Sequence, residues 1–167
     1  MPWVLGSIDL GDDVLEIGPG PGLTTELLRA RAPHLTAVEI DPELASTVAS
    51  KFPDVEVVNA DATELPLPDG RFSAAVSLTM LHHVPSAALQ DRLLGEVCRV
   101  LRPGGLFIGS DSTASFLFRV AHLFDTMVLV DPSSFGDRLA RAGFDEIKVN
   151  AAPGAFRFRA QKASLET

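Results

Sequence analysis

Residues 14–22 read VLEIGPGPG, and the architecture of the chain can be worked out from this stretch. A short apolar strand at 14–17 runs directly into a loop with glycine at every second position, and a helical stretch at 23–31 follows. Glycine has no Cβ, so the backbone of such a loop can approach a ligand closely at the start of a helix. The pattern predicts a nucleotide-type pocket, with a tight turn of purely conformational purpose as the alternative.

Two acidic residues flank this loop and indicate which ligand it favours. Glu16 stands just before the glycines, where it would repel a bound pyrophosphate but not a ligand that carries an ammonium and a sulfonium. Glu39 ends the next apolar run, 35–40, at about the separation expected for an acid that accepts hydrogen bonds from two ribose hydroxyls. The pattern therefore favours a cationic nucleoside. Asp41, two residues later, is better explained as a helix cap.

Strand and helix patterns alternate along the rest of the chain. The predicted strands after the first are 35–40, 55–58, 72–77, 106–109, 144–149 and 155–160, and the later helices are 42–50, 86–101 and 132–142. The turn residues at 102–105, RPGG, separate the third helix from the strand at 106. The apolar segment 110–130 predicts a helix or a flap across the sheet.

Seven strands with intervening helices predict an α/β fold. We expect a doubly wound, Rossmann-like sheet, mostly parallel with an antiparallel last strand, inside an α/β/α sandwich. The ligand crevice of such a sheet lies beyond the carboxyl ends of its strands, and the loops singled out above all follow strands.

These blocks, taken in order, resemble the class I S-adenosylmethionine-dependent methyltransferases of the small-molecule type. Besides the glycine loop and its two acids, the resemblance rests on three stretches: NADAT at 59–63, FSAAVSLTMLHHV at 72–84 and VLRPGG at 100–105. It runs from about residue 10 to 109 and continues more weakly over 131–163. It implies S-adenosyl-L-methionine as the cofactor.

The resemblance also implies roles for individual residues. The glycine loop would hold the methionine end of the cofactor, Asp61 would accept the adenine amine, and the Ala62 N–H would donate to the adenine ring. An ordinary Asx turn is the alternative for Asp61. The expected cofactor-binding residues are Glu16, Gly18, Pro19, Gly20, Gly22, Glu39, Ile40, Asp61, Ala62 and Leu78.

Two adjacent histidines are the candidates for catalysis. A sulfonium methyl is already activated, so the main task is to hold the acceptor in line with the sulfur, in a site closed to water. A general base is needed only for a protonated acceptor, and His82 or His83 could supply it because imidazole titrates near neutrality. Packing and helix capping are the alternative for this pair. An ion pair best explains the i, i+3 spacing of His122 and Asp125, and no metal site is predicted.

Composition limits the class of protein and its partners. The 167 residues fit one domain, 1–167, in which 1–10 form a truncated N-terminal lid containing Trp3 and 110–130 form a variable substrate-side segment. A net charge of −8 argues against a nucleic-acid partner. No apolar run is long enough to cross a membrane and no secretory signal is visible, so we expect a cytoplasmic protein. Cys98, the single cysteine, fits a core position.

The predicted function is methyl transfer from S-adenosylmethionine to a small-molecule acceptor by in-line displacement. One alternative is a non-catalytic cofactor-binding or interaction module, suggested by the short lid, which a homodimer partner could also complete. Another is an NAD(P)-dependent oxidoreductase, which would need glycine or alanine three residues after Gly20, where Leu23 stands. The acceptor, and whether its oxygen, nitrogen or carbon is methylated, stays open.

Overall fold

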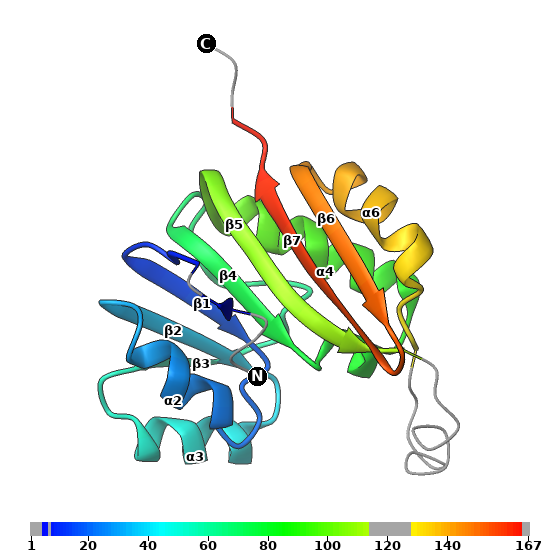
Figure 1. The fold of residues 1–167 in the computed structure, drawn as a ribbon. Helices are drawn as coiled ribbons and strands as arrows, with labels where there is room; N and C mark the ends of the chain where they lie inside the picture. The colour runs from blue at the N-terminus through cyan, green and yellow to red at the C-terminus, as the bar shows by residue number, and fades with distance from the viewer. Residues whose placement is uncertain (1–4, 7, 114–127, 165–167) are drawn as a thin grey trace.

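The structure is a computed structural model that describes residues 5–6, 8–113 and 128–164. Its described strands form one seven-stranded sheet in the order β3-β2-β1-β4-β5-β7-β6 (Figure 1). Only β7 runs against its neighbours β5 and β6, while the other pairings are parallel. This confirms the predicted mostly parallel sheet with an antiparallel last strand. The strands are β1 (Asp13–Ile17), β2 (His34–Glu39), β3 (Glu56–Asn59), β4 (Phe72–Leu78), β5 (Leu101–Ser112), β6 (Phe144–Ala152) and β7 (Ala155–Lys162).

Helices cover both faces of the sheet and enclose a separate apolar core on each side. One core joins the sheet to α2 (Leu23–Arg29) and α3 (Pro42–Lys51), and the other joins it to α4 (Ala87–Val100) and α6 (Pro132–Arg141). Figure 1 shows these two helix pairs on opposite faces. The predicted α/β/α sandwich is therefore confirmed. None of the helices in the described ranges is long and apolar enough to cross a membrane.

Side-chain caps begin α3, α4 and α6 where the sequence predicts helix starts. The Asp41 carboxylate accepts from the backbone N–H groups of Glu43 and Leu44 at 2.8 and 3.0 Å. The Ser86 hydroxyl accepts from the Leu89 N–H at 3.1 Å, and Asp131 caps α6 in the same manner. These bonds satisfy backbone donors that the first helical turn leaves without partners.

The strand β5 differs from its prediction, because it begins at Leu101 and not at residue 106. Leu101 pairs with Phe72 and Leu106 pairs with Ala74, so residues 102–105 stand outside the ladder as a bulge. The helix α4 does end directly before the RPGG stretch: its last residue is Val100, and Leu101 is already extended with φ −74° and ψ 146°. The chain rejoins the sheet before the turn residues as well as after them, which a local pattern of helix breakers does not reveal.

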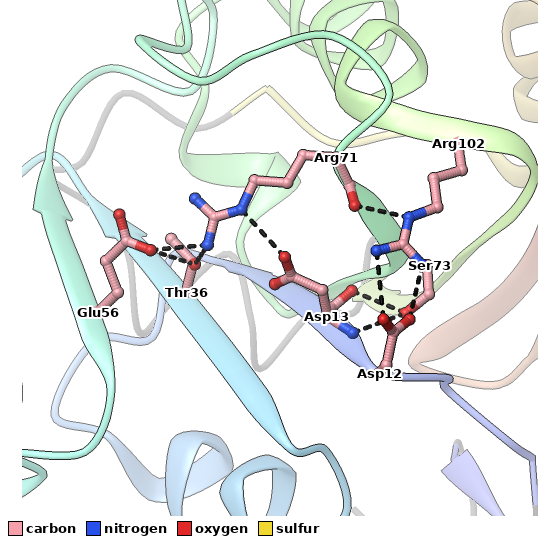
Figure 2. A network of polar contacts seen from close by, with 7 residues as sticks. All are labelled: Asp12, Asp13, Thr36, Glu56, Arg71, Ser73 and Arg102. Atoms are coloured by element: carbon pink, nitrogen blue, oxygen red, sulfur yellow. Dashed lines mark hydrogen bonds and ion pairs between the residues drawn. The ribbon is translucent and has the colours of Figure 1, made fainter.

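A polar network around Arg71, which directly precedes β4, joins the amino-terminal parts of β1, β2, β3 and β5 at the edge opposite the glycine loop. Arg71 donates to Asp13 Oδ2 at 3.0 Å, to Glu56 Oε2 at 2.7 Å and to the Thr36 hydroxyl at 2.8 Å. Figure 2 shows its guanidinium lying between these three side chains, which come from β1, β2 and β3. Arg102 binds Asp12 and the Arg71 carbonyl beside it. The network thereby ties together the ends of strands that meet again at the candidate site.

We expect Arg71→Ala to lower the free energy of unfolding by about 1–2 kcal/mol, because it removes charged hydrogen bonds in a half-exposed setting. The guanidinium holds the pKa of the Glu56 carboxyl below its ordinary value. This stabilisation is thus present above the ordinary glutamate pKa and is lost as the pH falls through the lowered one. Urea unfolding of wild type and variant at neutral and acidic pH measures both effects. Arg92→Ala, which removes a more exposed pair with Glu64, is the control, and equal losses in the two variants would contradict the prediction.

Candidate functional site

A cavity of about 620 Å³ opens beyond the carboxyl ends of the parallel strands, within the size range of small-ligand sites. Its described walls come from the loops that follow β1, β2, β3 and β4 and from side chains of α2, α3 and α4. The structure thus brings together segments that are separate in the sequence. Eight of the expected cofactor-binding residues line it: Gly18, Pro19, Gly20, Glu39, Ile40, Asp61, Ala62 and Leu78.

The glycine loop forms one wall, and two of its glycines are required for different reasons. Gly18 has φ +66°, and a Cβ there would lie 2.3 Å from Cγ of Met80, which belongs to the loop after the neighbouring strand β4. Gly20 has φ +54°, and a Cβ there would meet nothing within 4 Å. Gly18 therefore allows two walls to approach, whereas Gly20 faces open space. Gly22 is the N-cap of α2, packs against Phe52 and lies outside the cavity lining.

Glu39 forms the junction between the loop and the end of β2. Its carboxylate accepts from the Gly20 N–H at 3.0 Å through Oε2 and from the Asp41 N–H at 3.1 Å through Oε1. An ionised carboxylate offers about four lone-pair sites, so capacity for two further donors is left. Asn59 donates to the Glu39 and Ile40 carbonyls at 2.8 and 3.0 Å and fixes this corner. This role of Asn59 was not predicted from the sequence, although its place at the end of a strand could have suggested it.

Glu16 lies behind the cavity wall and is not part of the lining. Its side chain is buried and accepts hydrogen bonds from the hydroxyls of Thr24 and Thr25. Burial raises the pKa of Glu16, against the lowering effect of the two hydroxyls. Thr24 does line the cavity, so Glu16 supports a wall residue that sequence reasoning missed. Direct contact between Glu16 and a cationic ligand stays a prediction.

Asp61, in the loop after β3, forms an Asx turn and also lines the cavity. Its Oδ1 accepts from the Thr63 N–H at 2.8 Å, which makes an Asx turn. The same residue is exposed and lines the cavity next to Ala62. Within the described part of the chain, no hydrogen bond reaches Asp61 Oδ2. The turn thus lies at the cavity wall, and adenine binding by Asp61 and Ala62 stays a prediction.

The loop after β4 begins with a strained residue that sequence reasoning missed. Thr79 has φ +56°, an unusual value for a β-branched residue. Its N–H donates to the Ser110 carbonyl at 2.8 Å and its hydroxyl to the Leu78 carbonyl at 2.7 Å. Leu78, Thr79 and Met80 all line the cavity. The strained backbone of Thr79 directly precedes Met80, which packs over Gly18.

The two histidines of the short helix η1 (Leu81–His83) lie in different surroundings. His83 is exposed and lines the cavity, whereas His82 is 3% exposed and contacts the buried Asp111. The role of a general base stays a prediction for both residues. Trp3, His122 and Asp125 lie outside the described residues. Of the N-terminal segment, Leu5 packs into the core with α2 and α3.

The sequence of this chain is similar to those of known methyltransferases. A family model described as "Methyltransferase domain" matches residues 15–109. A "Probable S-adenosylmethionine-dependent methyltransferase" of Mycobacterium tuberculosis is 38% identical over 98 residues, which are 59% of this chain and 35% of that protein. A "Probable ribosomal RNA small subunit methyltransferase A" of Haloarcula marismortui is 41% identical over 95 residues, 53% of this chain and 32% of that protein. The chain spans about a third of the length of these curated relatives.

A solved structure shares the whole fold. The phosphoethanolamine N-methyltransferase 2 of Haemonchus contortus, in complex with S-adenosyl-L-methionine, superposes with a TM-score of 0.81. The match covers 96% of this chain and 50% of that one, at 16% sequence identity. At this identity, the likeness concerns the fold alone.

Proposed function

The chain belongs to the methyltransferase domain family, in the class I S-adenosylmethionine-dependent methyltransferases, and we propose that it binds S-adenosylmethionine in the cavity and transfers the methyl group to a small-molecule acceptor. The glycine loop would hold the amino-acid end of this cofactor, Glu39 its ribose, and Asp61 with the Ala62 N–H its adenine. The family match supports the activity, and the positions of these residues around one cavity support the binding mode.

The observation that carries the proposal is the junction of Glu39 with the glycine loop. A 7%-exposed carboxylate here holds the loop by its Gly20 N–H and still lines the cavity. A negative group at this point disfavours a phosphate-bearing dinucleotide and favours a nucleoside with vicinal hydroxyls. Leu23 also lines the cavity at the position where a dinucleotide fingerprint would have a small residue.

When bound, S-adenosylmethionine supplies a methyl group activated by its sulfonium. The chain has to orient the acceptor and keep water away, which can contribute several kcal/mol. The wall beyond Met80 is apolar, with Val84, Leu89 and Leu93, and supports both tasks. His83 lines the same wall, which supports a role for it as the general base toward an alcohol or phenol acceptor.

A calorimetric titration with S-adenosylhomocysteine, which is not consumed, tests the binding step. We expect saturable binding to one site, and no fluorescence change with NADH. Binding of NADH and not of S-adenosylhomocysteine would overturn the proposal in favour of an oxidoreductase.

Transfer of a labelled methyl group tests the acceptor class. The panel contains small alcohols, phenols and amines, and also ribosomal RNA because some relatives carry that name. We expect transfer to a small molecule, in line with the net charge of −8. Transfer to RNA alone would refute the small-molecule acceptor, and cofactor binding without any transfer would favour a non-catalytic module. Unchanged turnover of both His82→Ala and His83→Ala would refute a histidine base.

A further inference from the structure

A buried carboxylate at the end of β5 holds the histidine that precedes the cavity residue His83. Asp111 is 0% exposed, and its Oδ2 accepts from the His82 backbone N–H at 3.0 Å. Its Oδ1 contacts His82 Nδ1 and also accepts from the Ser112 N–H at 2.6 Å. Asp111 therefore fixes both the main chain and the imidazole of His82.

A buried carboxylate–imidazole pair is not required for the stability of the fold at this position. Burying a carboxylate and an imidazole is costly, and well-packed apolar side chains of similar size often stabilise a core as well or better. The surrounding core is indeed apolar, with Leu81, Phe156 and Phe158 among its members. The pair instead gives orientation, because a carboxylate with backbone donors on both oxygens cannot turn without breaking a bond.

The fixed imidazole in turn contacts the cavity residue. The ring centroids of His82 and His83 lie 4.2 Å apart, with an interplanar angle of 39°. The main chain of η1 is held from other directions as well: the Val128 N–H donates to the His82 carbonyl at 3.1 Å, and Gln90 donates to the Leu81 carbonyl at 3.1 Å. His83, which lines the cavity, thus follows a turn whose position is set by Asp111.

We propose that Asp111 and His82 are positioning residues that hold the His83 imidazole against the methyl acceptor. This inference rests on the proposed function, since it gives His83 an acceptor to face. The carboxylate keeps the proton of His82 on Nδ1, because an acceptor on one ring nitrogen selects the tautomer. The His82 ring then presents one constant surface to His83.

Asp111→Asn tests the arrangement with little change of shape. One carboxylate oxygen becomes an NH2 group, which meets a backbone donor at either place: the Ser112 N–H at Oδ1 or the His82 N–H at Oδ2. At Oδ1 the amide donates to His82 Nδ1 and the His82 proton moves to Nε2, whereas at Oδ2 the hydrogen bond that holds the main chain of η1 is lost. We expect the ¹⁵N signals of the His82 ring to show the reversed tautomer or a released ring, and the His83 ring signals to shift or to split into several conformers, already in the free protein.

Further variants separate positioning from loss of fold and from failure of the proposed function. Asp54→Asn, at an exposed pair with Arg29, should leave the signals of both rings unchanged. His82→Gln should disturb His83 in the same way as Asp111→Asn, which keeps the test open if one variant fails to fold. Both variants should bind S-adenosylhomocysteine with the wild-type affinity. If the wild type itself does not bind S-adenosylhomocysteine, the proposed function is refuted, whereas the ring signals still test the positioning of His83. Unchanged His83 signals in folded Asp111→Asn would overturn the inference.

Discussion

Glu39→Ala is expected to lower the affinity for S-adenosylmethionine by roughly two orders of magnitude. Two hydrogen bonds from ribose hydroxyls to a carboxylate would be lost, at a cost of about 3 kcal/mol. The chain should stay folded, because the N–H groups released by the change belong to the half-buried Gly20 and the exposed Asp41, where water can bind them. Calorimetry with S-adenosylmethionine and S-adenosylhomocysteine measures the loss.

Two further variants serve as controls for the Glu39→Ala result. Glu39→Gln keeps the size of the side chain but removes its charge and half of its acceptor capacity, so its affinity should lie between wild type and Glu39→Ala. Glu43→Ala, an exposed acid in the first turn of α3, should bind as the wild type does. Wild-type affinity in folded Glu39→Ala would remove the basis of the proposed binding mode.

Gly18→Ala is expected to lower cofactor affinity at least tenfold, because Met80, which lines the cavity beside Gly18, must shift. The new methyl group would lie 2.3 Å from Met80 Cγ, closer than any real contact, so Met80 must shift. Overpacking of this kind costs about 1–3 kcal/mol, and the left-handed backbone adds about 1 kcal/mol. Calorimetry measures the affinity, and the midpoint of thermal unfolding measures the accompanying loss of stability.

A double variant separates the clash from the backbone strain. Met80→Ala combined with Gly18→Ala removes the overlapping atoms and should recover most of the lost affinity. Gly154→Ala has the same kind of strain, with φ +86° and open space around the new Cβ, but it lies in the β6–β7 hairpin. It should lower stability without changing affinity. Failure of the double variant to bind better than Gly18→Ala would show that the contact with Met80 is not the cause.

Much of the fold follows from local patterns. Apolar runs predicted the strands, and Asp41, Ser86 and Asp131 stand where helices begin because their side chains satisfy backbone donors one turn ahead. The glycine loop and Glu39 predicted the edge of the sheet at which the cavity lies. These features depend on neighbours in the chain or on the general geometry of parallel sheets, so they are readable without knowledge of long-range packing.

The functions of single side chains depended on contacts between distant segments. The contacts of Glu16 with Thr24 and Thr25 of α2 were not predicted from the sequence, and its expected contact with the ligand stays a prediction. His82 and His83 are adjacent in sequence, yet one faces the core and Asp111 while the other faces the cavity. Periodicity and helix capping depend on residues only a few positions apart, so they can be recognised in the sequence. The partner of a buried acid or imidazole is set by strand register and packing across 29 residues, which no local pattern encodes.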